Sequence, residues 1–189
     1  MVAVGYYPDV YIDSDHWLHR VKRRLSPNAN ARPDPDDISL VVVHGISLPP
    51  GRFGTTYVDE LFCNTLDCKL DPALADLDGV RVSAHVFITR RGRVTQYVPF
   101  DRRAWHAGVS SHRGRQDCND FAVGVELEGT DESAYTNSQY RALIELLKAL
   151  GGRYPRISWS AIVGHGEISP GRKTDPGPLF DWPRLYRAL

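Results

Sequence analysis

Three residues far apart in the sequence carry side chains that zinc prefers as ligands. His44 directly follows the apolar run ISLVVV, and His165 similarly follows the apolar pair Ile162-Val163. Asp175 stands ten residues after His165, in the stretch GHGEISPGRKTDPG. Two imidazoles and one carboxylate would leave a fourth tetrahedral position for water, as a catalytic zinc requires. Spacing alone leaves a second interpretation open, in which all three are hydrogen-bonded polar residues of loops.

Further side chains could take part in the hydrolysis of an amide. Such a reaction needs a base for the proton of the attacking water and an acid for the leaving amine. Glu126 or Glu128 could fill this role, because both project from one face of a predicted strand. Lys173, two positions before Asp175, could stabilise an oxyanion by its charge. The alternative for these residues is an ordinary solvent-exposed position.

Periodicity predicts the strands that must position these residues. Residues 38–44 form a short β-branched run that is typical of a buried strand, with His44 at its end. Alternating apolar residues predict strands over 80–89 and 121–129, and the residues after Gly92 form the hairpin partner of the former. Segment 164–177 has no apolar repeat, so it is predicted to be an ordered loop.

Helical patterns complete the predicted fold. A capping box opens a helix at Thr136, and the glycine pair 151–152 is expected to end it. Residues 55–62 fit another helix, and Asp181 caps a short one near the C-terminus. Strands and helices alternate too irregularly for a purely parallel sheet. The sequence therefore predicts an α/β fold, a single domain with a mixed central β-sheet flanked by helices.

The composition fits one globular domain and argues against several classes of partner. Of 189 residues, 42% are hydrophobic, which is enough for an ordinary core. Basic and acidic residues number 23 each, so charge gives no reason to expect a nucleic acid or an anionic membrane as partner. We expect no secretory signal or membrane span, and three cysteines without a CxxC pair favour the cytoplasm. An exported protein whose signal had been removed would look similar.

The sequence also predicts a division of the chain. The Pro/Asn/Asp-rich segment 26–37 is expected to have no core-building capacity of its own. We therefore expect an N-terminal extension, residues 1–37, that precedes or packs on the main domain, residues 38–189.

Six motifs follow one another in a distinctive order. They are VVVHGISLPPG, VSAH, YVPFDRRAWHAGVS, CNDFAVGVELEGTD, AYTNSQY and GHGEISPGRKTDPGPLFDW. In sequence and spacing they resemble the cytosolic AmpD-type 1,6-anhydro-N-acetylmuramyl-L-alanine amidases. Those enzymes belong to a zinc amidase superfamily that also contains phage amidase lysozymes and peptidoglycan recognition proteins. The resemblance covers roughly residues 38–189, which would then be an amidase domain.

The resemblance implies a role for each candidate residue. It assigns the ligands of one zinc ion per chain to His44, His165 and Asp175. It assigns catalysis to Glu126, not Glu128, and to Lys173. It places along the muropeptide groove Arg81, Trp105, His106, Ala107 and Arg172.

The implied function is zinc-dependent hydrolysis of the amide bond between 1,6-anhydro-N-acetylmuramic acid and the L-alanine of the stem peptide. A monomer in the cytoplasm would perform it, in peptidoglycan recycling, and would limit the muropeptides that signal β-lactamase induction. Two alternatives stay open, an amidase acting on intact peptidoglycan and a non-catalytic peptidoglycan-binding module. The binding module would typically have lost a zinc ligand, whereas all three candidates are present here.

Two departures from the family concern the fit of the substrate. Gly45 stands where the family usually has asparagine, so one polar contact to substrate is expected to be missing or replaced. The segment CKLDPALADLDGV also lacks the usual aromatic loop sequence.

Overall fold

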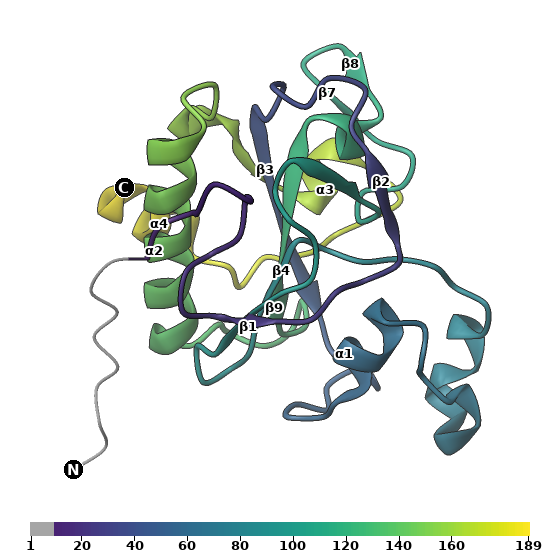
Figure 1. Ribbon diagram of the computed structural model, residues 1–189. Coiled ribbons are helices and arrows are strands. Elements are labelled where there is room, and N and C mark those ends of the chain that lie inside the picture. The colour runs from purple at the N-terminus through teal and green to yellow at the C-terminus, as the bar shows by residue number, and fades with distance from the viewer. Residues whose placement is uncertain (1–9) are drawn as a thin grey trace.

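A six-stranded sheet forms the centre of the molecule. The computed structural model describes residues 10–189. The strands of the sheet are β1 (Lys22–Arg23), β3 (Leu40–Ile46), β4 (Val86–Ile88), β5 (Val94–Gln96), β9 (Ala122–Glu128) and β10 (Ile162–Gly164). Their order across the sheet is β1-β5-β4-β9-β3-β10 (Figure 1). All neighbours run parallel except the hairpin pair β4 and β5, which confirms the predicted mixed sheet.

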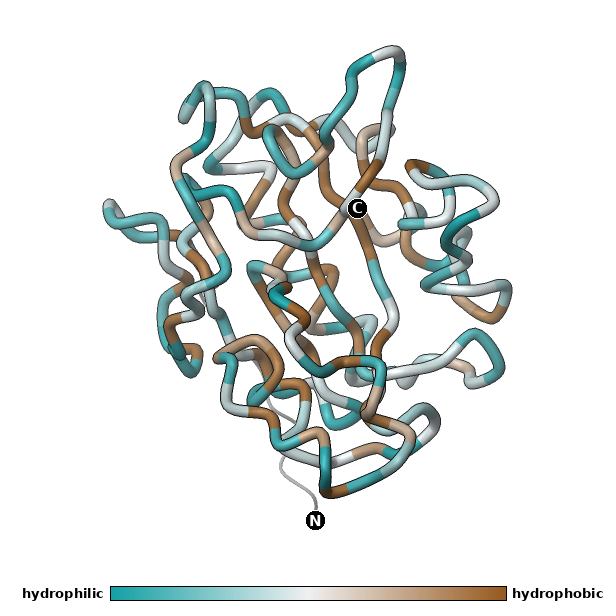
Figure 2. Tube along the Cα trace, turned by 90° about the vertical axis from the view of Figure 1, so that its right-hand side faces the viewer, coloured by the Kyte–Doolittle hydropathy of each residue, from teal (hydrophilic) through white to brown (hydrophobic). Residues whose placement is uncertain are grey.

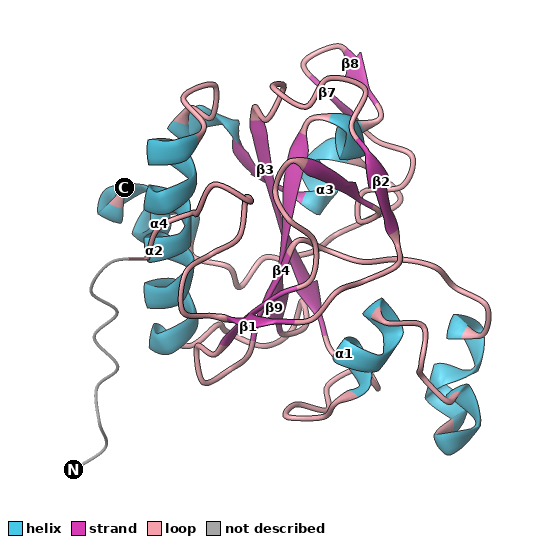
Figure 3. Cartoon of the chain, in the orientation of Figure 1, coloured by secondary structure: helices cyan, strands magenta, loops and turns pink. Residues whose placement is uncertain are grey.

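Smaller elements surround this sheet (Figure 3). Two antiparallel pairs join β2 (Ala29–Ala31) to β6 (Arg102–Ala104) and β7 (Ser111–His112) to β8 (Arg115–Gln116). The α-helices are α1 (Tyr57–Phe62), α2 (Asn137–Arg153), α3 (His165–Ile168) and α4 (Trp182–Ala188). Short 3-10 helices span Cys68–Leu70, Pro72–Leu77, Cys118–Asp120 and Trp159–Ala161. Across residues 10–189, no helix combines the length and the apolar composition that crossing a bilayer requires.

The two faces of the sheet bury different side chains. Odd-numbered residues of β3 and β9 pack against α2 in the main hydrophobic core. Even-numbered residues such as Leu40 and Val42 lie on the opposite face, where they pack with Ile168 of α3. Hydrophobic stretches follow the central strands, and hydrophilic ones occupy the outer loops (Figure 2). His44 and Glu126 are even-numbered as well, so they lie on the face away from α2, towards the carboxyl ends of the strands.

The N-terminal segment contributes more to the fold than its composition predicts. Segment 26–37 supplies no buried apolar residue to the core, as expected, but it forms β2 and contains Arg32, which is only 5% exposed. The guanidinium of Arg32 donates to the carbonyls of Phe100, Asn119, Asp120 and Ala122. Polar side chains that bond to distant carbonyls leave no periodic trace in a sequence. The first nine residues of the predicted extension 1–37 lie outside the described part of the chain.

Two predicted elements differ in length. The strand predicted over 80–89 is limited to β4, because the amide of Ser83 donates to the carbonyl of Trp105 and draws the preceding residues off the sheet. The glycine pair 151–152 does not end α2, which runs on for one more residue. A side chain at the first of these glycines would approach Trp159 to 3.1 Å, so the glycine serves close packing.

Candidate active site

His44, His165 and Asp175 converge at the carboxyl edge of the sheet. The Nδ1 atoms of the two histidines lie 3.0 Å apart. Oδ2 of Asp175 lies 3.2 Å from Nδ1 of His44 and 3.1 Å from Nδ1 of His165. Both imidazoles are buried. The structure thus brings together the three residues whose spacing suggested a metal site, and their ligand atoms could hold one ion.

Strand pairing explains how residues so distant in sequence meet. His44 lies within β3, two residues before the strand ends rather than at its end, and its register partner in β9 is Glu126. β10 runs parallel to β3 on its other side, and His165 directly follows β10. Parallel strands present their carboxyl ends at one edge of a sheet, so His44, Glu126 and His165 lie at the same edge.

The segment that carries two of these residues is more regular than predicted. Segment 164–177 was expected to be a loop, but it begins with the helical turn α3. The side chain of Glu167 accepts the N–H of Gly164 at 2.8 Å and fixes the start of this turn. The carbonyl of Asp175 accepts the N–H of Gly166 at 3.0 Å, which folds the rest of the loop back onto the turn. These two hydrogen bonds explain how the Gly/Pro-rich segment 164–177 stays ordered.

The outer nitrogens of both histidines fix their tautomers. Nε2 of His165 lies 3.1 Å from the carbonyl oxygen of Ala107, which can only accept, so Nε2 carries the proton. Nε2 of His44 lies 3.0 Å from Nδ1 of His106, and we assign it as the donor. Both inner Nδ1 atoms then present lone pairs to each other and to the Asp175 carboxylate. Three acceptors at such distances need a shared cation, so the donor set fits a metal ion.

The charge states of the site support this assignment. Burial, with the charge of His165, lowers the pKa of His44 to about 4, so its imidazole is neutral at pH 7. Burial and the charge of Asp175 raise the pKa of Glu126 well above its usual value. Glu126 is therefore more easily protonated than an exposed glutamate, as a group that must take up a proton requires.

Glu126 faces the metal-binding atoms. Its Oε1 lies 3.9 Å from Nδ1 of His44. Its Oε2 is buried without a hydrogen-bond partner among residues 10–189. The surface alternative for Glu126 and Glu128 is wrong, because the two residues are only 9% and 4% exposed.

A cavity of about 310 Å³ opens over these groups. Lys173 lines it together with Glu126 and the three metal-binding side chains. Its opposite wall is apolar and consists of Leu48, Leu61, Phe62, Leu77, Val80 and Val82. Sequence reasoning missed this wall, because apolar residues of a cavity and of a core look alike in a sequence.

The predicted groove residues occupy different places. Trp105 and His106 line the cavity. Ala107 is fully buried, and its carbonyl accepts a hydrogen bond from Arg172 at 2.6 Å. Arg172 and the exposed Arg81 lie outside the set of residues that line the cavity.

Two residues that sequence reasoning missed hold His106 in place. A Cβ on Gly124 would overlap the imidazole of His106, so this position of β9 needs glycine. The side-chain oxygen of Asn119 accepts the amides of His106 and Ala107 at 3.1 and 2.8 Å. Both residues belong to the motif CNDFAVGVELEGTD, but the presence of a glycine or an asparagine in a sequence does not by itself indicate a role in positioning another side chain.

Comparison with known proteins gives consistent matches. Residues 34–178 match the family model described as N-acetylmuramoyl-L-alanine amidase. The chain is 54% identical over 173 residues to the 1,6-anhydro-N-acetylmuramyl-L-alanine amidase AmpD of Citrobacter freundii, covering 92% of this chain and 91% of that protein. A crystal structure of a selenomethionine AmpD derivative matches with a TM-score of 0.91 at 52% identity, covering 94% of this chain and 98% of that chain. The Escherichia coli amidase AmiD, in complex with the substrate anhydro-N-acetylmuramic acid-L-Ala-D-γ-Glu-L-Lys, matches with a TM-score of 0.59 at 28% identity, covering 95% and 65%.

Proposed function

The chain belongs to the N-acetylmuramoyl-L-alanine amidase family, and from that membership we propose that it cleaves 1,6-anhydro-N-acetylmuramyl peptides. The bond broken joins the lactyl carbonyl of the sugar to the nitrogen of L-alanine. This activity serves peptidoglycan recycling. The observation that carries the proposal is the cluster of His44, His165 and Asp175, whose ligand atoms lie within 4.8 Å of one another. Glu126 and Lys173 share its cavity.

Zinc is the metal that we propose for these three ligands, one ion per chain. The family depends on zinc in general. Two neutral imidazoles and one carboxylate make the donor set of a catalytic zinc, which keeps one position open. Bound there, the ion would polarise the substrate carbonyl and lower the pKa of a water molecule. The contacts of His44 with His106 and of His165 with the Ala107 carbonyl keep both rings in the required tautomer.

Glu126 is the proposed general base. Its unpartnered Oε2 would take a proton from the water as the oxygen attacks the lactyl carbonyl. The same oxygen would then give this proton to the departing nitrogen of L-alanine. A raised pKa suits both steps, because the group must accept and release a proton near neutral pH.

The remaining assignments concern charge and orientation. The ammonium group of Lys173 would stabilise the negative charge that develops on the carbonyl oxygen. Trp105 and His106 would contact the sugar, since both line the cavity. Arg172 would act indirectly, by holding the carbonyl of Ala107 in place. For Arg81 we propose a contact at the exposed rim of the groove.

We place this activity in the cytoplasm and in a monomer. The three cysteines, Cys63, Cys68 and Cys118, are free thiols, as a reducing compartment would keep them. One chain supplies every proposed site residue, so the chemistry needs no second copy. By consuming anhydromuramyl peptides the enzyme would limit the muropeptides that signal β-lactamase induction.

The test compares two substrates side by side by mass spectrometry of the products. With zinc present, anhydromuramyl-L-Ala-D-γ-Glu-L-Lys should yield the free tripeptide and the anhydro sugar, whereas intact sacculi should release little peptide. Equal cleavage of sacculi would support an amidase of intact peptidoglycan. Binding of the muropeptide without cleavage would support a non-catalytic module.

A further inference from the structure

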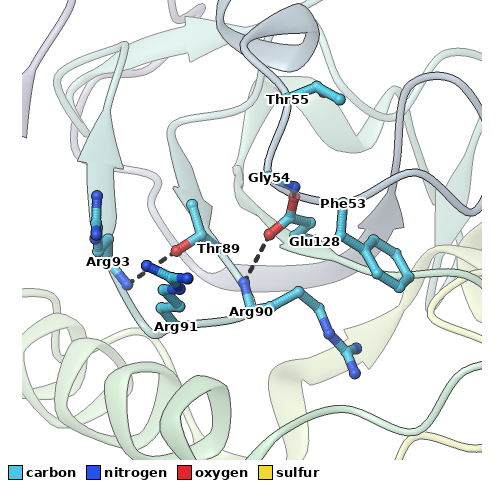
Figure 4. A pocket seen from close by; sticks show the side chains of 8 residues that line it. All are labelled: Phe53, Gly54, Thr55, Thr89, Arg90, Arg91, Arg93 and Glu128. Carbon is cyan, nitrogen blue, oxygen red and sulfur yellow. Dashed lines mark hydrogen bonds between the residues drawn. The ribbon is translucent and has the colours of Figure 1, made fainter. Parts of the chain in front are cut away.

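A second, larger cavity lies beside the zinc site. Its volume is about 500 Å³, and it opens among the loop after β3, the turn between β4 and β5 and the end of β9 (Figure 4). It is lined by Phe53, Gly54, Thr55, Thr89, Arg90, Arg91, Arg93 and Glu128. Glu128 lines this cavity and Glu126 lines the zinc cavity; the two residues lie on the same face of β9, about 7 Å apart along the strand. We call this second space the arginine cavity.

Glu128 fixes the walls of the arginine cavity. Its carboxylate accepts the amide N–H of Gly54 on one side and that of Arg90, at 2.8 Å, on the other (Figure 4). The loop after β3 and the β4–β5 turn are thereby joined through one buried side chain, 4% exposed. Two backbone donors already offset the negative charge of Glu128. Glu128 is the only acidic residue among the described residues that line the cavity, and its carboxylate already accepts these two hydrogen bonds.

Arginine side chains supply the remaining charge of the cavity. Arg90 stacks its guanidinium 4.8 Å above the ring of Phe53, and its buried Nη1 has no hydrogen-bond partner among residues 10–189. Arg91 and Arg93 follow in the same turn and take part in none of the ion pairs formed within that range. A ligand that enters this space meets several guanidinium donors that lack an acceptor. Guanidinium groups bind carboxylates through paired, charge-assisted hydrogen bonds.

We propose that the arginine cavity binds the free carboxylates of the stem peptide beyond L-alanine. This inference rests on the proposed amidase function and adds a determinant of substrate length to it. An extended peptide advances about 3.3–3.6 Å per residue, so the second or third residue after the cleaved bond spans the distance from Glu126 to Glu128. A D-γ-glutamyl residue, linked through its side chain, keeps its α-carboxylate free to meet Arg91 and Arg93.

The experiment compares a short and a long substrate. We would measure kcat/KM for anhydromuramyl-L-Ala and for anhydromuramyl-L-Ala-D-γ-Glu-L-Lys with the wild-type enzyme and with Arg91→Gln/Arg93→Gln. The double variant should lose on the order of tenfold with the long substrate, mainly through KM, and nothing with the short one. Arg52→Gln is the matched control, because Arg52 is exposed and pairs with Asp71 instead. A loss that is equal for both substrates, or no loss for either, would overturn the proposal.

A binding measurement keeps this test independent of catalysis. Calorimetry would compare the peptide L-Ala-D-γ-Glu-L-Lys with its analogue in which the α-carboxylate of glutamate is an amide. The carboxylate should bind more tightly than the amide to the wild-type protein, and equally weakly to Arg91→Gln/Arg93→Gln. An equal affinity of both peptides for the wild-type protein refutes the inference even if the enzyme is an amidase. Selective binding of the carboxylate without any cleavage would instead refute the proposed function alone.

Discussion

The hydroxyl of Tyr135 occupies the space where a side chain on Gly45 would begin. A Cβ built on Gly45 would overlap this oxygen. The same hydroxyl donates to the carbonyl of Pro176 at 3.0 Å, and Pro176 follows Asp175. Tyr135 therefore lies between Gly45, which follows the proposed ligand His44, and Pro176, which follows the proposed ligand Asp175.

A substitution at Gly45 should therefore disturb the metal site. Gly45→Ala should lower the free energy of unfolding by about 1–3 kcal/mol, the usual cost of an added methyl group in a filled space, and weaken zinc binding. In the Gly45→Ala/Tyr135→Phe double variant most of this loss should be recovered, because the overlapping oxygen is gone. Zinc affinity and thermal unfolding of both single variants and the double variant measure the coupling. Purely additive effects would show that the two residues act independently.

The proposed ligand set leads to a prediction about metal content. The purified protein should contain about one zinc per chain, and Asp175→Ala should lose both metal and activity, because two imidazoles alone bind zinc weakly. Elemental analysis and product formation would be measured on the same samples. Asp76→Ala is the control and should change neither quantity, because Asp76 is exposed and is not among the residues that line the zinc cavity. Full activity of Asp175→Ala after treatment with a chelator would remove Asp175 from the ligand set.

Local sequence patterns predicted on which strand and face the site residues lie, but they did not predict which other residues surround them. The alternation in 121–129 predicts that Glu126 and Glu128 share a face, because side-chain direction in a strand follows from parity alone. Burial of these carboxylates could not be predicted in this way. The cover over Glu128 comes from Gly54 and Arg90, which are distant in the sequence.

The elements that were missed have the same physical origin. Arg32 has no periodic partner, and its place in the core depends on four carbonyls that only the folded chain brings together. Residues 80–85 alternate like a strand, yet the bond from Ser83 to Trp105 diverts them. Hydrogen bonds over such separations are decided by tertiary structure, which a local pattern does not encode.

His85 predicts a pH dependence of stability. Its Nδ1 accepts the amide of Gly124 at 3.0 Å, and its Nε2 donates to the carbonyl of Arg102 at 2.9 Å. Protonation of Nδ1 would place two donors against each other. Burial, followed by the charge of Arg32, lowers the pKa of His85 from 6.5 to about 3. Because the unfolded chain binds a proton at higher pH than the folded chain, the free energy of unfolding should fall as pH drops from about 6.5 towards 3.

The variant His85→Gln isolates this contribution. Its amide oxygen can accept from Gly124, but the side chain does not titrate. The free energy of unfolding would be measured with denaturant between pH 7 and pH 4. Its slope against pH should be shallower for the variant by up to about 1.4 kcal/mol per pH unit, which corresponds to one proton. His44 is buried as well and is present in both proteins, so its contribution cancels in the comparison. Parallel pH profiles would contradict the prediction.

The last prediction separates Glu126 from Glu128, which share a face of β9 but have different neighbours. Glu126→Ala should keep zinc, since Glu126 is not a ligand, and should lose on the order of a hundredfold or more in turnover, the usual scale for a positioned base. Glu128→Ala should keep most of its turnover on the short substrate. It should instead unfold more easily, by about 1 kcal/mol or more, because the amides of Gly54 and Arg90 lose the carboxylate that accepts from them.

Zinc content, thermal unfolding and the rate of cleavage at L-alanine would be measured for both variants. The expected pattern is an inactive, stable Glu126→Ala and an active, destabilised Glu128→Ala. Only one of the two carboxylates can lie within hydrogen-bond reach of the attacking water, because residues two apart on a strand are separated by about 7 Å. Equal losses of turnover would therefore indicate a shared structural role. A larger loss for Glu128→Ala would move the role of base from the zinc cavity to the arginine cavity.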